Sequence, residues 1–285
     1  MVKIEEEKCI GCGKCVQDCV GHALKLEDGK AAVKRECILC GHCAAICPMD
    51  AVKITEYESD EMIPYEKERF QLDPEVYANA VKFRRSVRNY KEQPVEIEKI
   101  RKILDVAAHT ATAKNERKMK FVIVQDRLDE FKEMVFEGIG EELELHKGEK
   151  SPVTALLYSF YKGRTRDPKE EFLFRNAPAV LYIMGERLDD AGLAAQNIEM
   201  MAQALGLGVL YNGYLKAATM CSEKVRNFLD KEGRPVAVCM LIGYPAVTYR
   251  RTAPRKEAEY EIFKIGLTSK FECVIFVPSN GKGVA

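Results

Sequence analysis

The 285-residue sequence lacks several features that would indicate particular classes of protein. Lys and Arg together number 44, as do Asp and Glu, so no excess of positive charge indicates a nucleic-acid partner. No apolar run approaches the about 20 residues of a membrane span, and the N-terminus lacks the basic and then apolar layout of a signal peptide. Pro and Gly are not in excess, which argues against disorder. We therefore expect a globular, cytoplasmic protein with no membrane or nucleic-acid partner.

Cysteine, by contrast, is abundant, and eight of the 11 cysteines fall between Cys9 and Cys47. They form two runs with the spacing C-x2-C-x2-C-x3-C, the bacterial ferredoxin pattern in which the fourth Cys of each run binds the other cluster. This spacing predicts one [4Fe–4S] cluster on Cys9, Cys12, Cys15 and Cys47, and a second on Cys37, Cys40, Cys43 and Cys19. Two zinc knuckles are the alternative, but four ligands per zinc give no reason for the third and fourth Cys of each run.

The repeat extends beyond the cysteines. Residues 23–26 correspond to residues 51–54, one period of 28 residues later. Between them, residues 24–30 alternate and end in Asp-Gly-Lys, which predicts a tight hairpin. Because so short a segment cannot bury an adequate core, we expect the clusters to stabilise it. We predict a two-cluster, ferredoxin-like domain over residues 1–56.

An acidic, irregular stretch over residues 57–74 is interpreted as a linker to a second domain, residues 75–285. There the patterns predict helices over 94–109 and 190–205, and strands over 121–124, 180–184 and 236–242. The helix over 190–205 is apolar on more than one side, which is typical of a core or a subunit interface. The predicted fold class is α+β, with helices around a mixed sheet.

Residues 138–176 fit neither period and place aromatic residues among basic ones. A long irregular stretch in a compact domain is often a lid over a site. An ordinary surface excursion with its own small apolar cluster is the alternative.

A basic segment, Arg-Arg-Ser-Val-Arg, contains Arg84, Arg85, Ser86 and Arg88. The planar guanidinium of Arg binds phosphate through two parallel hydrogen bonds, and Ser adds a compact donor. The segment is therefore a candidate phosphate site. The chemistry alone favours a solvated basic helix end.

The same segment resembles the flavin-phosphate signature of the nitroreductase family of FMN enzymes. Further similarities follow in order at residues 112–115, at residues 206–213, and at residues 243–245 with the arginines at 250 and 251. The resemblance covers about residues 75 to 260, while the N-terminal part is similar to two-cluster ferredoxins. The whole chain resembles ferredoxin–nitroreductase fusions. It departs from many family members at residues 116–119, and it has no Trp.

The resemblance implies a role for each matching residue. Arg84, Arg85, Ser86 and Arg88 should hold the phosphate and ribityl groups of FMN, and Arg250 and Arg251 should close on the phosphate. Asn115 should contact the isoalloxazine or ribityl group, while Leu210, Asn212 and Gly213 should line the ring, largely through backbone groups. No catalytic side chain is nominated, because in this family the flavin is the reactive group.

A [4Fe–4S] cluster carries one electron and a flavin can carry two. The combination therefore suggests that two clusters relay single electrons from a low-potential donor, a ferredoxin or reduced nicotinamide, to FMN. The FMN would then reduce an electron-poor organic acceptor such as a nitroaromatic or a quinone. The resemblance also implies a homodimer. The alternatives are an NAD(P)H-driven flavin reductase whose ferredoxin-like domain is a docking module, an electron-carrier subunit of a larger redox complex, and a flavin-fragmenting or dehalogenating relative.

Overall fold

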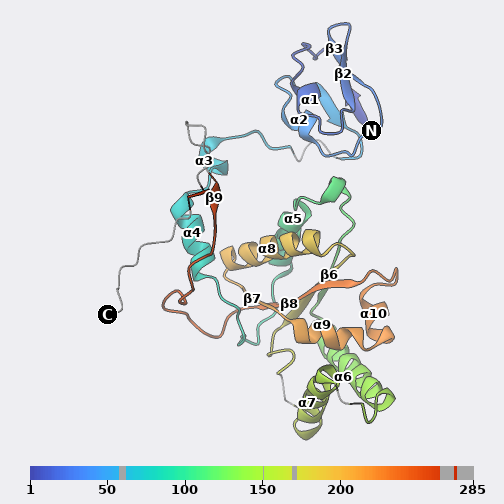
Figure 1. Cartoon of the computed structure of the whole chain (residues 1–285), viewed down its shortest axis with the longest axis vertical. Helices are drawn as coiled ribbons and strands as arrows, with labels where there is room; N and C mark the ends of the chain where they lie inside the picture. Colours follow the sequence, from blue (N-terminus) through green and yellow to red (C-terminus); the bar gives the residue numbers. More distant parts are fainter. Residues whose placement is uncertain (58–61, 150, 169–171, 264–272, 275–285) are drawn as a thin grey trace. The chain divides into compact units, whose positions relative to one another are not determined.

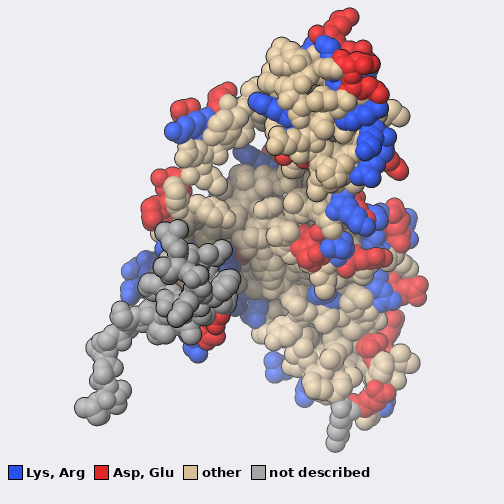
Figure 2. All heavy atoms as spheres, turned by 45° about the horizontal axis from the view of Figure 1, so that its top comes forward, with Lys and Arg blue, Asp and Glu red and all other residues tan. Residues whose placement is uncertain are grey.

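The computed structural model describes residues 1–57, 62–149, 151–168, 172–263 and 273–274 (Figure 1). The chain divides into two compact units, residues 1–249 and 250–285. On the face shown in Figure 2, basic and acidic side chains are interspersed, in keeping with the formal net charge of zero. Among the described helices, none combines the length and the apolar character of a membrane span.

The N-terminal part of the first unit consists of two antiparallel strand pairs and two short helices. Its elements are β1 (Val2–Ile4), α1 (Lys14–Gln17), β2 (Leu24–Glu27), β3 (Lys30–Val33), α2 (His42–Ala45) and β4 (Val52–Ile54). Strand β1 pairs with β4, and β2 pairs with β3. The predicted hairpin is confirmed, with Asp28 and Gly29 at φ angles of 48° and 77°. Positive φ at both central residues is what a two-residue type I′ turn requires.

The apolar cluster of this part is small. Buried residues such as Val2, Leu24 and Val52 pack together with the cysteines at positions 9, 15 and 43. Thiol groups therefore occupy positions that aliphatic side chains would fill in a larger domain. This agrees with the expectation that bound clusters stabilise the segment.

The segment predicted as an irregular linker, residues 57–74, contains helical structure. Within it lies α3 (Lys67–Phe70), and α4 (Pro74–Phe83) begins at its last residue. The prediction missed this because Pro74 is at the first turn of the helix, where proline is tolerated, and Asp73 supplies the cap. The Asp73 carboxylate accepts a hydrogen bond from the Val76 amide at 2.8 Å. Residues 58–61 of this segment lie outside the described part.

A four-stranded sheet forms the centre of the rest of the first unit. Its strands are β5 (Lys120–Val124), β6 (Ala179–Met184), β7 (Gly208–Tyr211) and β8 (Val236–Gly243), in the order β5-β6-β8-β7. The three strand pairs are antiparallel, and a parallel bridge from Ser86 to Val209 adds to the β7 edge. The three predicted strands are confirmed to within one residue at each end.

Helices cover both faces of this sheet (Figure 1). On one face lie α5 (Ile97–Ala108) and α8 (Leu188–Ala204). On the other lie α6 (Leu128–Leu145), α7 (Pro152–Arg166), α9 (Gly213–Met220) and α10 (Glu223–Leu229). Successive residues of β6 face alternate sides, so that Leu181 packs toward α8 and Tyr182 toward α6. This arrangement explains why β6 is buried along its whole length.

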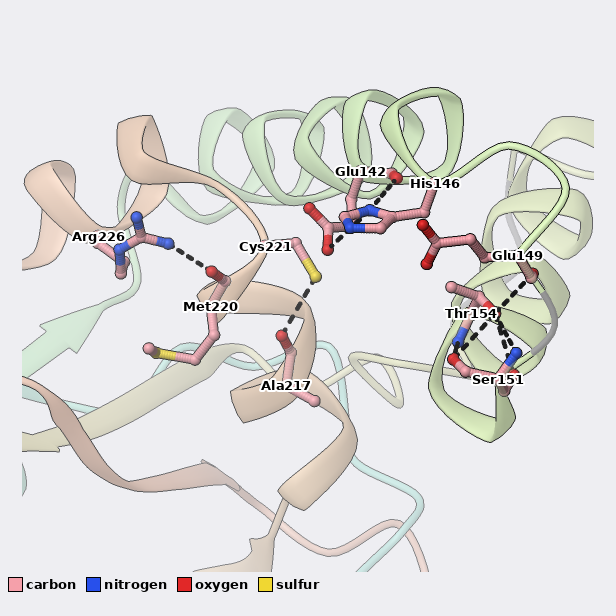
Figure 3. Close-up of polar contacts among 9 residues, drawn as sticks. All are labelled: Glu142, His146, Glu149, Ser151, Thr154, Ala217, Met220, Cys221 and Arg226. Atoms are coloured by element: carbon pink, nitrogen blue, oxygen red, sulfur yellow. Dashed lines mark hydrogen bonds and ion pairs between the residues drawn. The ribbon is translucent and has the colours of Figure 1, made fainter.

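Two predictions need correction: the irregular stretch over residues 138–176 and the start of the helix over 94–109. Residues 138–176 are largely helical, because α6 extends to Leu145 and α7 follows from Pro152. A short linker separates them, and Ser151 caps α7 by accepting from the Thr154 amide at 3.0 Å (Figure 3). The helix predicted from residue 94 begins instead at Ile97, because Glu96 has extended backbone geometry. Residues 150 and 169–171 lie outside the described part.

The second unit contributes one described strand pair. Strand β9 (Ile262–Phe263) pairs antiparallel with β10 (Cys273–Val274).

Candidate functional site

The first predicted set of cluster ligands surrounds one cavity. Cys9, Cys12 and Cys15 of the first run and Cys47 of the second all line it. Cys9 and Cys15 are buried, whereas Cys12 is exposed. The structure therefore brings the fourth cysteine of the second run to the first three of the other run, which is the crossed arrangement that the spacing predicts. That these thiols bind a cluster stays a prediction.

Backbone amides point at several of the predicted ligand sulfurs. The Ala23 amide donates to Cys19 Sγ at 3.2 Å, and the Ala51 amide donates to Cys47 Sγ at 3.3 Å. These two bonds occupy equivalent places in the 28-residue repeat. Hydrogen bonds to cluster sulfurs stabilise the more negative, reduced state and so raise the reduction potential. The fold thus provides donors where a cluster would gain electron density.

Of the second set, Cys37 and Cys40 lie near enough to Cys43 to interact with it electrostatically. Burial raises the pKa of the Cys43 thiol to about 11, with smaller contributions from Cys37 and then Cys40. Cys19 lies at the end of α1, beside Asp18, whose carboxylate pairs with His42 of α2 at 3.1 Å. No group of three or more potential ligands in the described residues converges on a point that suits a single metal ion.

The basic segment lies at a second pocket, of about 250 Å³. Arg84 and Arg85 line it together with Glu199 and Gln203 of α8 and the glycines at 206 and 208. Gly208 permits the close approach of β7 to the basic segment, because a Cβ there would lie 2.3 Å from a Val87 methyl carbon. The pocket is therefore formed by one face of α8, the start of β7 and the basic segment.

Arg84 is held in place by a buried carboxylate. Its Nη1 donates to Glu199 Oε1 at 2.8 Å, and Glu199 is only 3% exposed. Tyr211 of β7 lies near this pair. Burial, and then the negative charge of Glu199, raise the pKa of its hydroxyl. A buried carboxylate without a partner costs several kcal/mol, so this pair fixes the guanidinium of Arg84. Glu199 was not predicted from the sequence. The feature that marks it there is that it is a lone charged residue within the apolar stretch of α8.

Two buried polar atoms in this pocket have no partner within the described residues. They are Nη2 of Arg85 and Oε1 of Gln203. An unsatisfied buried donor or acceptor costs about 1–3 kcal/mol, so native structures usually pair such groups. A phosphate oxygen would accept from the arginine, and a ribityl hydroxyl would donate to the amide oxygen. These residues therefore fit the phosphate and ribityl end of FMN.

The remaining predicted phosphate residues are placed differently. Ser86 is half-buried, and its carbonyl accepts from the Tyr249 hydroxyl at 3.4 Å, while Arg88 is exposed. Arg250 and Arg251 are exposed residues of the second unit. Contact of these residues with a phosphate stays a prediction.

The loop predicted to lie under the flavin ring is held by the side chain of Asn212. Its Oδ1 caps α9 by accepting from the Leu215 amide at 2.9 Å, and its Nδ2 donates to the Leu173 carbonyl at 2.7 Å. Asn212 is 7% exposed. Leu210 precedes it at the edge of the sheet, and Gly213 opens α9. The side chain of Asn212 is thus occupied structurally, which leaves backbone groups of this loop for ligand contacts.

Asn115 does not line the pocket of the basic segment. It lies in the short 3-10 helix Ala113–Asn115, and its Nδ2 donates to the carbonyls of Ile38 and Leu39 at 2.9 and 3.0 Å. Its Oδ1 accepts from Arg117 Nε at 3.0 Å. Both ends of this side chain are therefore engaged, and the Nδ2 bonds reach the loop that carries Cys37 and Cys40. Its contact with FMN stays a prediction.

Comparison with known families decides the assignment. Residues 81–244, more than half of the chain, match the model described as the nitroreductase family. The chain belongs to the nitroreductase family. Residues 1–48 match the 4Fe-4S dicluster domain. The protein is therefore an oxidoreductase with an N-terminal iron–sulfur domain, and both matches agree with the cofactors expected from the sequence, FMN and two [4Fe–4S] clusters.

Individual relatives are more distant. A protein of Methanothermobacter thermautotrophicus, provisionally named NADH dehydrogenase/NAD(P)H nitroreductase, is 29% identical over 168 residues, which are 59% of this chain and 76% of that protein. Nitroreductases crystallised with bound FMN from Desulfitobacterium hafniense and Bacteroides fragilis are each 20% identical. They cover 62% and 68% of this chain and 93% and 98% of their own, with TM-scores of 0.48 and 0.49. Because these identities and TM-scores are low, the assignment to the family rests on the match to the family model.

Proposed function

We propose that this family member is an FMN-dependent reductase that draws single electrons through two [4Fe–4S] clusters and reduces an electron-poor organic acceptor, such as a nitroaromatic or a quinone. When bound, the clusters would supply one-electron steps and FMN a two-electron step. The observation that carries the proposal is the presence in one chain of a cavity lined by four cysteines and a pocket with an unpartnered arginine nitrogen.

The chain's own residues would bind and orient these groups. Cys9, Cys12, Cys15 and Cys47 would hold one cluster, and Cys19, Cys37, Cys40 and Cys43 the other. Arg85 would donate to the flavin phosphate from its unpartnered Nη2, next to Arg84, which Glu199 orients. Ser86, Arg88, Arg250 and Arg251 would complete the phosphate contacts. Backbone groups at Leu210 and Gly213 would line the ring, because the Asn212 side chain is occupied.

The hydrogen bonds of Asn115 support a relay between the two kinds of group. Electron transfer requires a cluster near the flavin, and Asn115 joins the nitroreductase segment to the carbonyls of Ile38 and Leu39 in the second cysteine run. The second cluster is therefore our candidate for the one that delivers electrons to FMN. We assign residues 1–56 to the iron–sulfur domain, 57–74 to the linker and 75–285 to the FMN domain.

We also propose a homodimer in the cytoplasm. Leu188 and Leu193 of α8 are 65% and 55% exposed, which is costly for large aliphatic side chains unless a second copy covers them. A reducing compartment would keep the eight ligating cysteines free of disulfides. The donor would be a ferredoxin or reduced nicotinamide. The name of the methanogen relative favours the second, which keeps an NAD(P)H-driven reductase as the alternative.

Cofactor content tests the proposal directly. The protein is purified without oxygen, and iron, sulfide and flavin are counted per chain. We expect about eight iron atoms, eight sulfides and one FMN, because each predicted cluster contains four irons. The Arg85→Ala variant should lose FMN and keep its iron, whereas Cys12→Ala should lose iron and keep FMN. Zinc in place of iron, or a full cofactor content in both variants, would exclude the proposed sites.

A further inference from the structure

A further pocket, of about 290 Å³, lies between α7 and α9 and has no role in the site described above. Phe160 and Arg166 of α7, Phe172 and Leu173 of the following segment, and Tyr214 of α9 line it. It adjoins the loop predicted to lie under the flavin ring, because Tyr214 follows Gly213 directly. The Leu173 carbonyl in its wall also accepts the hydrogen bond from Asn212 at 2.7 Å.

Three aromatic rings form one wall of this pocket. The rings of Phe160 and Phe172 are stacked, with centroids 5.5 Å apart, and Tyr214 lies 5.6 Å from Phe160. Phe172 is already engaged by Phe160 and by the guanidinium of Arg175, whereas Tyr214 is 51% exposed. An exposed aromatic ring at a cavity of this size suits a planar ligand of one or two fused rings.

Positive charge accompanies these rings. Arg166 lines the pocket, and within the described residues its side chain has no hydrogen bond or ion pair. The neighbouring Arg164, by contrast, pairs with Glu133 at 2.5 Å. The guanidinium of Arg175 lies 4.0 Å from the centroid of the Phe172 ring. Among the described residues that line the pocket, none carries a carboxylate. The chemistry of this pocket therefore favours an aromatic ring that carries a negative charge.

We propose that this pocket is the subsite that selects the organic acceptor, and that it takes aromatic rings with an anionic substituent such as a carboxylate. The ring would stack against Tyr214, and the substituent would pair with Arg166. This assignment rests on the proposed function, since it places the acceptor beside the predicted flavin loop. It adds a preference of substrate charge that the family assignment does not contain.

Binding of two matched probes tests this preference. The affinities of 4-nitrobenzoate and its neutral analogue 4-nitrobenzamide are measured by calorimetry on the oxidised, fully loaded protein. We expect the carboxylate to bind about tenfold more tightly, because a charged hydrogen bond contributes about 1.5 kcal/mol. Arg166→Gln should remove the preference and leave 4-nitrobenzamide unaffected. Arg164→Gln is the matched control and should retain the preference, because that arginine is already paired.

Replacing an aromatic wall gives an independent measurement. Tyr214→Leu should weaken both probes by a similar factor, since it removes a ring face and no charge. Equal affinities of the two probes for the native protein, or a preference that survives Arg166→Gln, would overturn the assignment. These outcomes are distinct from failure of the proposed function, which would appear earlier as protein without FMN or iron.

Discussion

The pair formed by Glu199 and Arg84 shows how a single buried charge can fix a binding residue. The carboxylate lies on α8, 115 positions along the chain from the arginine that it orients. The Arg84 side chain is 27% exposed and that of Glu199 is 4% exposed. Removing the arginine would therefore leave a buried charge without a charged partner, which is more costly than removing both members.

This pair predicts that the single substitution Arg84→Ala costs more stability than replacing both residues. Arg84→Ala should lower the free energy of unfolding of the flavin-free protein by roughly 3 kcal/mol, because Glu199 then stays buried without an opposite charge. The double variant Arg84→Ala/Glu199→Leu should recover most of that loss, since a leucine suits the apolar surroundings. Urea titration measures both. A double variant no more stable than the single one would show that burial of the carboxylate does not control stability here.

Two cysteines outside the two runs, Cys221 and Cys239, are predicted to be unreactive. Burial raises the pKa of Cys221 to about 11 and that of Cys239 to about 12, and Glu142 adds to the effect on Cys221. The Cys221 thiol also donates to the Ala217 carbonyl at 3.4 Å (Figure 3). A raised thiol pKa lowers the thiolate fraction at neutral pH, so the thiol becomes reactive only at higher pH.

The rate at which these two thiols are alkylated should therefore increase with pH. At pH 8 a thiol with a pKa of about 11 is ionised in roughly one molecule in a thousand, so iodoacetamide should leave Cys221 unmodified in the cluster-loaded protein. Modification should rise with pH, first at Cys221 and then at the more deeply buried Cys239. Peptide mapping by mass spectrometry follows both sites. If Cys221 were modified at pH 8 as fast as free cysteine, its pKa could not be raised as described.

At the scale of residues, local spacing carried the predictions that the structure supports. The two cysteine runs predict which thiols meet at the first cavity, because their spacing and crossing follow from the shape of a cube. Glu199 and the capping role of Asn212 were missed, because their partners lie far away in sequence or are backbone groups. Asn115 was matched by position to the flavin, whereas in the structure its amide bonds to Ile38 and Leu39.

At the scale of elements, β7 and the basic segment approach each other closely at one glycine. A Cβ at position 208 would lie 2.3 Å from a methyl carbon of Val87 and 3.0 Å from Pro245. Gly192 of α8, by contrast, has nothing within 4 Å of the position that a Cβ would occupy. These two glycines therefore respond to alanine in opposite ways.

The two substitutions form a matched pair. Gly208→Ala should reduce stability and FMN content together, because β7 and the basic segment must separate and both line the pocket. Gly192→Ala should raise the free energy of unfolding by up to about 1 kcal/mol, because alanine is the better helix former at an open position. Thermal unfolding and flavin absorbance measure the two effects. Full FMN occupancy in Gly208→Ala would argue against this pocket as the flavin site.

Strands were predicted more reliably than helix boundaries. The sheet strands read as short apolar runs, and β5, β6 and β8 match the expectation closely. The helical nature of α7 was missed because only Leu157 and Phe160 are buried, so that no long apolar stripe marks this helix in the sequence. Its start depends on the cap between Ser151 and Thr154, which a search for apolar periodicity does not detect.

At the scale of the whole molecule, one chain combines an iron–sulfur domain with a nitroreductase domain. Motif order along the sequence was sufficient to predict this combination. The acceptor could not be predicted, because the pocket between α7 and α9 is assembled from residues 136–214 and has no contiguous motif. Which cluster would pass electrons to FMN depends in the same way on the distances between these groups, and the order of residues does not specify those distances.

The most direct test of the account is the rate of flavin reduction by a reduced ferredoxin, followed by anaerobic stopped-flow absorbance. The native protein is compared with Cys40→Ala, which lacks a predicted ligand of the second cluster, and with Cys221→Ala as a control. The account predicts that Cys40→Ala slows flavin reduction by at least about a hundredfold, while Cys221→Ala leaves it unchanged. Equal rates in all three proteins would contradict the relay and leave the iron–sulfur domain as a docking module.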